Sequence, residues 1–189
     1  VDTLIDELLP HLAKGDILID GGNTNFRDTI RRYNMLKEKG IDFLDVGTSG
    51  GIWGLKVGYC MMIGGDEEPF KHVEPLIKTL APEDGYIYAG PSGAGHFTKM
   101  VHNGIEYGML QAYGEGFEII KKSQYDVDLH KLAITWNHGS VVRSWLLELA
   151  ERAFADDDDL EDIRGYVEDS GEGRWTVQEA INENVPAPV

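Results

Sequence analysis

The sequence predicts an α/β layer followed by an all-helical part, and two observations support this prediction. Short apolar runs alternate with helical patterns up to residue 90, which is typical of a largely parallel sheet covered by helices. From about residue 93 onward only helical periodicity remains, beginning with one long helix. We therefore divide the chain into an α/β part, residues 1–92, and a helical part, residues 93–189.

In the α/β part each expected helix has an identifiable stop or start. Gly15 and Gly40 are suited to the position just after a helix, and Asn25 or Thr24 can cap the helix between them. The strands are short apolar runs with many β-branched residues, as expected of buried strands. The predicted helices are 2–14, 25–39 and 67–80, and the predicted strands are 16–20, 41–46, 59–63 and 86–89.

The helical part begins with a helix that runs to about residue 122. A second helix is predicted over residues 128–137, and a third starts from Ser140 as its cap. Thr176 is predicted to cap a last short helix, residues 177–182. The aspartate run at residues 156–159 is interpreted as a solvated linker or helix start and not as a metal site.

Composition limits the possible partners. The net charge of −16 over 189 residues argues against a nucleic-acid ligand, because phosphate binding needs a basic surface. No stretch approaches the roughly 20 apolar residues of a membrane span, and the single Cys60 excludes an internal disulfide and a cysteine metal cluster. We expect a cytoplasmic protein. Because Val1 stands inside an amphipathic pattern, we also expect the chain to be part of a longer protein.

Polar residues and glycines follow three of the predicted strands. Asn23 follows the first strand, Ser49 follows the second, and residues 93–99 follow the fourth. In open α/β sheets ligands bind outside the carboxyl ends of the strands, where glycines let the backbone approach the ligand. The pattern therefore predicts that these three segments meet at one edge of the sheet and form a binding site.

The long helix carries a polar face just after its glycine-rich turn. On a helical projection Asn103 and Glu106 lie within about 40° of Lys99, and His102 and His96 lie about 60° to either side. This grouping of an amine, an amide, imidazoles and a carboxylate favours a catalytic site over a solvated helix surface, in which Glu106 would be a surface partner of Lys99. The opposite face is apolar and is expected to enter a core; it comprises Phe97, Met100, Val101, Gly104 and Ile105.

Four motifs are distinctive: residues 16–32 (DILIDGGNTNFRDTIRR), 45–51 (DVGTSGG), 93–107 (GAGHFTKMVHNGIEY) and, more weakly, 171–176 (GEGRWT). They resemble the 6-phosphogluconate dehydrogenase family of decarboxylating β-hydroxyacid dehydrogenases. The chain is similar to the shorter members, and Arg174 stands where long members more often have Lys. The resemblance implies that residues 1–92 are the C-terminal part of a Rossmann-like dinucleotide-binding domain. Residues 93–189 would be part of a helical substrate and dimerisation domain. The glycine fingerprint G-x-G-x-x-G is absent from this chain.

The resemblance implies a reaction and its requirements. The family converts 6-phosphogluconate to ribulose 5-phosphate and CO₂ with reduction of NADP or NAD, in the pentose phosphate pathway, and needs no metal. Members are homodimers or homotetramers. The chain by itself would be inactive, and the residues that choose between NADP and NAD would precede Val1.

Carried over by motif, Lys99 would be the general base at the C3 hydroxyl of the substrate, and Glu106 would be the acid that protonates C1 of the enediol after CO₂ departs. Lysine can act as a base only if burial or another cation lowers its pKa. Asn23 would lie between the substrate and the nicotinamide ribose, in contact with both. The other implied substrate-binding residues are Ser49, Gly50, Gly51, His102, Asn103, Tyr107 and Arg174.

Two other functions remain open from the sequence. A related dehydrogenase of small 3-hydroxy acids would need Lys99 and Asn103 but not Glu106 or a phosphate-binding cation. The chain could also be a non-catalytic segment that binds an anionic sugar acid and self-associates.

Overall fold

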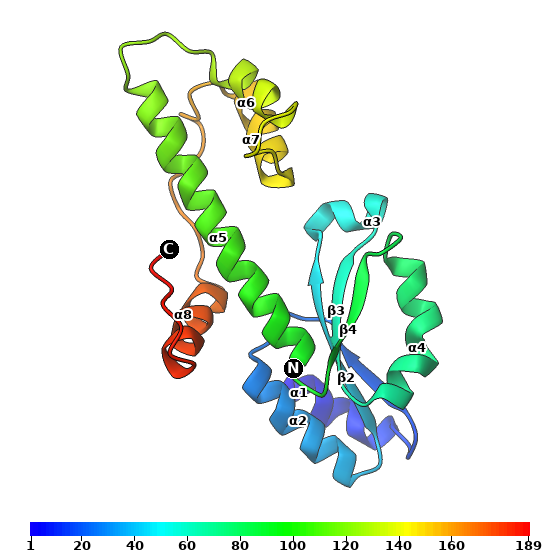
Figure 1. Ribbon diagram of the computed structural model, residues 1–189. Coiled ribbons are helices and arrows are strands. Elements are labelled where there is room, and N and C mark those ends of the chain that lie inside the picture. The colour runs from blue at the N-terminus through cyan, green and yellow to red at the C-terminus, as the bar shows by residue number, and fades with distance from the viewer. The chain divides into compact units, whose positions relative to one another are not determined.

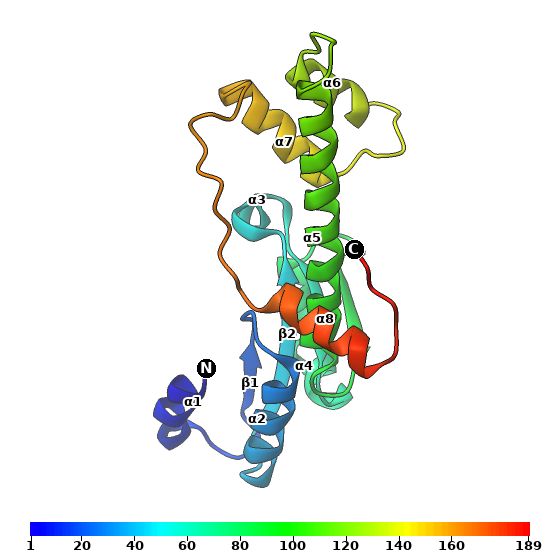
Figure 2. The same cartoon turned by 90° about the vertical axis from the view of Figure 1, so that its left-hand side faces the viewer.

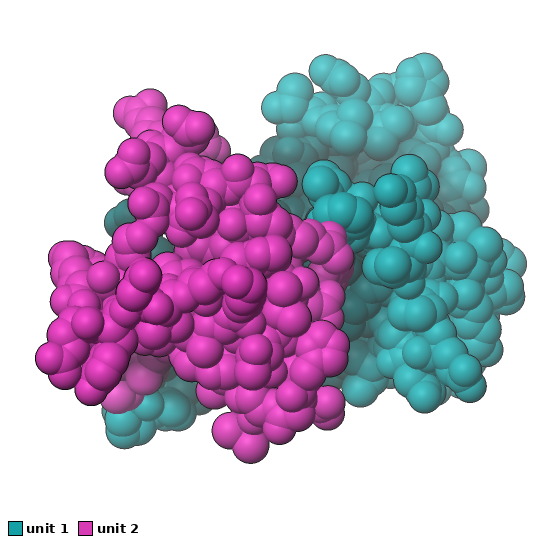
Figure 3. All heavy atoms as spheres, turned by 90° about the horizontal axis from the view of Figure 1, so that it is seen from above, with its two compact units in different colours: residues 1–103, 172–186 teal, residues 104–171, 187–189 magenta.

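A computed structural model describes all 189 residues, which form two compact units (Figure 3). The first unit comprises residues 1–103 and 172–186, and the second comprises residues 104–171 and 187–189. The long helix α5 (Ala94–Lys121) passes from the first unit into the second. The contacts of this helix with the sheet, described below, are the reason that its first turns belong to the first unit. The domain boundary at residue 92 stays a prediction.

The first unit is built on a four-stranded sheet in the order β1 (Ile17–Asp20), β2 (Asp42–Ser49), β3 (Cys60–Gly64) and β4 (Tyr86–Gly90), as Figure 1 shows. The β1–β2 and β3–β4 pairs are parallel, whereas β2 and β3 are antiparallel. A parallel connection needs a crossover of a dozen or more residues. Only residues 50–59 join β2 to β3, in a short 3₁₀ turn η2 (Gly51–Trp53) and the one-turn helix α3 (Gly54–Val57).

The antiparallel pair corrects the expectation that three strand ends share one edge. Because β4 runs against β2, its carboxyl end does not lie beyond Ser49. Gly90 pairs with Gly64, which pairs with Asp45, which in turn pairs with Asp20. The start of α5 therefore lies level with the end of β1, while β2 continues past both to Ser49.

The two faces of β2 contact different helices. Leu44 and Val46 face α4 (Glu67–Leu80), which contributes Phe70 and Ile77 to their cluster. Phe43, on the other face, packs with residues of α1 (Asp2–Leu8) and α2 (Phe26–Glu38). Successive side chains of a strand point to opposite faces of the sheet, and β2 therefore contacts α4 on one face and α1 and α2 on the other. Asp45 and Gly47 share the face of Phe43, and the start of α5 packs there.

Several predicted boundaries need correction. The first helix ends at Leu8, because Pro10 belongs to a following 3₁₀ turn, η1 (Leu9–His11), instead of a helix to residue 14. Strand β2 extends to Ser49, so Gly47 is a strand residue and not part of a turn. The cap at Asn25 is confirmed, since its Oδ1 accepts a hydrogen bond from the Arg27 N–H at 3.0 Å.

The second unit packs α6 (Leu129–Asn137) and α7 (Trp145–Asp156) with the later turns of α5. Asp128 caps α6 by accepting from the Lys131 N–H, whereas α7 is capped by Ser144 and not by Ser140. Its buried cluster consists of Phe117, Leu129, Ala133, Leu147 and Phe154. No helix of either unit combines the length and the apolar content of a membrane crossing.

Helix α8 (Glu172–Asn182) returns to the first unit and begins four residues before the predicted cap, Thr176. The motif at residues 171–176 is therefore the first turn and a half of a helix, entered through Gly171 at φ 92°, and not a turn. Figure 2 shows α8 beside α2 and the first part of α5. Arg27 of α2 forms an ion pair with Glu179 in the second half of α8, N–O 2.7 Å.

The start of α5 is held on the sheet by a buried carboxylate. Asp45 is fully buried, and its two oxygens accept hydrogen bonds from the N–H groups of Gly93 (2.8 Å) and His96 (2.9 Å). A carboxylate at a helix N-terminus satisfies N–H groups that lack partners within the helix and complements the helix dipole. Gly95 allows close approach, because a Cβ there would lie 2.4 Å from the Met62 carbonyl oxygen.

We predict that Asp45→Asn lowers the free energy of unfolding by about 2 kcal/mol, because an amide can accept only one of the two buried hydrogen bonds. Urea unfolding measures the effect. Asp42→Asn, a half-buried position of the same strand, is the control and should change stability by less than about 0.5 kcal/mol. Equal stabilities of the two variants would contradict the assigned role of Asp45.

Candidate active site

Lys99 lies one helical turn after the capped start of α5, with the stem of its side chain against β2. A Cβ added at Gly47 would lie 2.4 Å from Lys99 Cβ, so only glycine at this strand position leaves room for the lysine. Lys99 is half-buried, and its Nζ donates a hydrogen bond to Asn103 Oδ1 at 2.5 Å. The amine is thus fixed against the strand and is not a freely solvated lysine.

Asn103 joins Lys99 to His102. The Asn103 side chain is 8% exposed, and its Oδ1 also lies 3.0 Å from His102 Nδ1. One amide oxygen therefore contacts both an amine and an imidazole, which orients the two groups together. The structure brings together Lys99, His102 and Asn103 of the predicted site residues.

The expected apolar face of α5 enters a core only in part. Met100 is buried, but Val101 is 37% exposed and Ile105 is 63% exposed, whereas the polar His96 and Asn103 are buried. The prediction is wrong for Val101 and Ile105. At the start of α5, β2 presents Asp45 and Gly47 instead of large apolar side chains, and the helix packs there through backbone N–H groups and the stem of Lys99.

Ser49, Gly50 and Gly51 follow directly where β2 ends. Gly50 has φ 127° and Gly51 has φ 50°, conformations that L side chains rarely adopt. The chain therefore turns sharply after the half-buried Ser49 and presents backbone next to a hydroxyl. Such a turn can bind a carboxylate through N–H groups and the serine side chain.

Asn23 is exposed on the turn after β1. The turn is shaped by Asp20, whose carboxylate accepts hydrogen bonds from the Gly22 N–H (3.0 Å) and from Thr24 Oγ1 (3.1 Å). The Asn23 side chain is consequently presented at the carboxyl end of β1, whose last residue is level with Asp45 of β2.

Three further predicted residues lie on later turns of α5 and on α8. Arg174 is exposed in the first turn of α8, in the first unit. Glu106 is half-buried on the part of α5 that belongs to the second unit. Tyr107, 38% exposed, has its hydroxyl 3.0 Å from Ser170 Oγ within that unit. The roles of these three residues stay predictions.

Sequence reasoning missed Glu172. Glu172 is only 1% exposed, although it is the first residue of α8 and belongs to a glycine-rich motif. Burial raises the pKa of its carboxyl above the ordinary 4.5, and the positive charge of Lys99 opposes this rise. The only sequence signal is an acidic residue two positions before Arg174, which does not distinguish a buried carboxyl from an exposed one.

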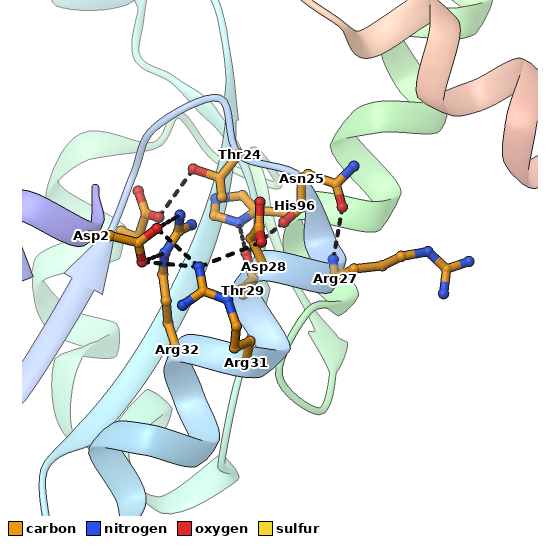
Figure 4. A network of polar contacts seen from close by, with 10 residues as sticks. Asp2, Thr24, Asn25, Arg27, Asp28, Thr29, Arg31, Arg32 and His96 are labelled. Atoms are coloured by element: carbon orange, nitrogen blue, oxygen red, sulfur yellow. Dashed lines mark hydrogen bonds and ion pairs between the residues drawn. The ribbon is translucent and has the colours of Figure 1, made fainter.

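A second polar network joins α5 to α2 and α2 to α1 (Figure 4). His96 is 2% exposed, and its Nδ1 lies 2.7 Å from Thr29 Oγ1 of α2. Nearby, Arg32 and Arg31 both donate to Asp2, which holds the pKa of that carboxyl well below its usual range. This network ties α1, α2 and α5 together, and we assign it a structural role.

Comparisons with known proteins agree with these features. The profile of the NAD-binding domain of 6-phosphogluconate dehydrogenase matches residues 1–90, and the profile of the C-terminal domain of the same enzyme matches residues 95–189. The two matches together cover nearly the whole chain. The chain belongs to the 6-phosphogluconate dehydrogenase family.

Individual relatives and solved structures cover the whole of this chain but are themselves longer. The chain is 53% identical to the Bacillus subtilis protein YqeC over 189 residues, which are 100% of this chain and 64% of that protein. It is 45% identical over 191 residues to the NAD(+)-dependent, decarboxylating 6-phosphogluconate dehydrogenase of Haloferax volcanii, covering 100% of this chain and 63% of the relative. The chain therefore spans somewhat less than two thirds of these relatives.

Among solved structures, the Plasmodium falciparum 6-phosphogluconate dehydrogenase matches with a TM-score of 0.86 and 35% identity, over 99% of this chain and 42% of that one. The 3-hydroxyisobutyrate dehydrogenase of Salmonella typhimurium matches with a TM-score of 0.76 over 98% of this chain and 66% of the Salmonella chain. The two sequences are only 16% identical, so this likeness shows a shared fold alone.

We predict that the buried His96 makes stability fall as the pH is lowered. Burial holds the pKa of His96 below 6.5, against the opposing charges of Asp45 and Asp20. Below about pH 6.5 the unfolded chain therefore binds a proton that the folded chain does not, and the slope approaches at most about 1.4 kcal/mol per pH unit. Urea unfolding between pH 7.5 and 5.5 should show a smaller slope for His96→Gln.

The matched control for this measurement is His72→Gln, which changes an exposed histidine of α4. This variant should keep the slope of the wild type. If His96→Gln and the wild type lose stability in parallel as the pH falls, the buried imidazole is not the group responsible.

Proposed function

We propose that the protein containing this chain oxidatively decarboxylates 6-phosphogluconate to ribulose 5-phosphate and CO₂, with NAD or NADP as the oxidant. The observation that carries the proposal is the Lys99 amine, packed against Gly47 of β2 and hydrogen-bonded to Asn103. The family of the chain and the names of its relatives in Haloferax volcanii and Plasmodium falciparum support the choice of substrate.

In this proposal Lys99 is the general base. In its neutral form the amine takes the proton of the C3 hydroxyl while the C3 hydrogen leaves as hydride, and the nicotinamide cofactor supplies the hydride acceptor. The 3-keto acid that results loses CO₂ readily, because the carbonyl accepts the electrons of the breaking bond. The lysine, now an ammonium, polarises that carbonyl by donating a hydrogen bond.

Glu106 is proposed as the acid that, after CO₂ has left, returns a proton to C1 of the enediol, which was C2 of 6-phosphogluconate. It follows Lys99 by seven residues, two helical turns in the sequence of α5. Its assignment, and that of Tyr107 as a phosphate contact, rests on the motif at residues 93–107.

The residues at the carboxyl ends of β1 and β2 fit the rest of the proposal. A Cβ added at Gly21 would meet no atom within 4 Å, so the exposed turn that carries Asn23 is open to a nicotinamide ribose. Ser49 and the Gly50–Gly51 turn suit the substrate carboxylate. Arg174, exposed at the start of α8, suits the phosphate because guanidinium binds phosphate in bidentate fashion. On the resemblance we also propose a homodimer or homotetramer.

The proposal predicts that the full-length protein releases labelled CO₂ from 1-¹⁴C-labelled 6-phosphogluconate when NAD or NADP is present. Lys99→Ala should abolish both CO₂ release and cofactor reduction while the substrate still binds, because only the base is removed. Lys71→Ala, an exposed lysine paired with Glu67 on α4, is the control and should keep normal turnover. Cofactor reduction without CO₂ would indicate a simple 3-hydroxyacid dehydrogenase instead.

For Glu106→Gln we expect turnover to fall by at least about 100-fold with little change in substrate affinity, as for loss of a general acid. The amide keeps the size of the side chain but cannot donate the proton. Steady-state kinetics and calorimetric titration with 6-phosphogluconate separate the two effects. An unchanged turnover would assign Glu106 a structural role.

A further inference from the structure

Glu172 is a buried carboxyl for which the proposed reaction has no role so far. Its side chain is 1% exposed, and its Oε2 is buried without a hydrogen-bond partner. A carboxylate enclosed in this way is costly unless a charge of opposite sign compensates it. The charge that acts on Glu172 is the ammonium of Lys99, which opposes the rise of the carboxyl pKa caused by burial.

The position of Glu172 relative to Lys99 is set by direct contacts between α8 and α5. Thr176, one turn after Glu172, donates its hydroxyl to the carbonyl of Met100, the residue next to Lys99, at 2.9 Å. The same hydroxyl lies 2.9 Å from the Glu172 carbonyl. Together with the Arg27–Glu179 ion pair at 2.7 Å, this contact attaches two adjacent turns of α8 to α5 and α2.

Other groups on α5 and β2 also stand near Lys99. On α5, Asn103 is a neutral amide whose Oδ1 lies against both Lys99 Nζ and His102 Nδ1, and Glu106 stands seven residues further along the helix. On β2, Gly47 has no side chain, and the carboxylate of Asp45 is bound by the N–H groups of Gly93 and His96. In the first unit, α8 therefore supplies a second carboxyl that is enclosed near the amine.

We propose that Glu172 is a positioning residue for Lys99, whose negative charge sets the pH at which the lysine amine becomes a base; this inference rests on the function proposed above. Coupling between two sites is reciprocal. Because the ammonium of Lys99 favours the ionised form of Glu172, the carboxylate of Glu172 must favour the ammonium by the same free energy. Lys99 then keeps its proton until the pH is higher than it would be beside a neutral group.

The consequence for the reaction is a defined protonation cycle. Lys99 starts each turnover as an amine, takes the hydroxyl proton, and becomes an ammonium beside the carboxylate of Glu172. The negative charge stabilises the product form of the lysine, in which it polarises the carbonyl during decarboxylation. Glu172 itself breaks and forms no bond, and its effect reaches the substrate only through Lys99.

The test measures the pKa of Lys99 in the full-length protein without relying on turnover. The rate of acetylation of Lys99 by acetic anhydride is followed by peptide mass spectrometry across a pH series. Glu172→Gln, which is nearly isosteric, should lower the pKa of Lys99 by at least about half a unit. This raises its acetylation rate at least about threefold at pH values below that pKa. The acidic limb of the kcat/KM profile for 6-phosphogluconate should move to lower pH by the same amount.

Two variants separate charge from packing. Glu172→Asp keeps the carboxyl and should restore a pKa of Lys99 near that of the wild type. Glu183→Gln, an exposed position directly after the same helix, should leave the acetylation rate unchanged. The proposal is wrong if Glu172→Gln acetylates like the wild type, or if Glu172→Asp behaves like Glu172→Gln. If the wild type releases no CO₂ from 6-phosphogluconate, the proposed function fails, whereas the acetylation result still decides whether Glu172 and Lys99 are coupled.

Discussion

The hydrogen bonds between Asp45 and the start of α5 are the interaction on which the rest of the structure depends. A buried carboxylate in the middle of β2 must be satisfied, and the two N–H groups of Gly93 and His96 satisfy it. This contact fixes both where α5 begins and which strand it lies on. Lys99 follows one turn later, so its position against Gly47 is a direct result of the cap.

The close approach of helix and strand accompanies the burial of polar side chains on α5. Gly47 and Gly95 remove the side chains that would hold the two elements apart. The buried polar side chains of this part of α5 are His96 and Asn103, and each of them has its own polar contact, with Thr29 and with Lys99. Buried polar groups need such partners to be stable, and they specify a single orientation of the helix.

Burial has different effects on the two ionisable groups that pack around the start of α5. It lowers the pKa of His96, which favours a neutral imidazole in a structural position. It raises the pKa of Glu172, where the ammonium of Lys99 acts in the opposite direction. Helix α5 thus carries the buried His96 and, one turn further, Lys99, while the carboxyl proposed to be coupled to Lys99 comes from α8.

The sequence by itself determined the alternation of strands and helices, the cap at Asn25, the family motifs and the grouping of Lys99 with Asn103. These follow from local periodicity and spacing along one helix. Only the tertiary structure decided that β3 runs against β2, that Val101 and Ile105 stay exposed, and that Glu172 is buried near Lys99. Strand direction depends on a connection that is too short for a crossover. The burial of Glu172 depends on the contact between α8 and Met100, which lie some seventy residues apart in the chain. No local sequence pattern predicts such a contact.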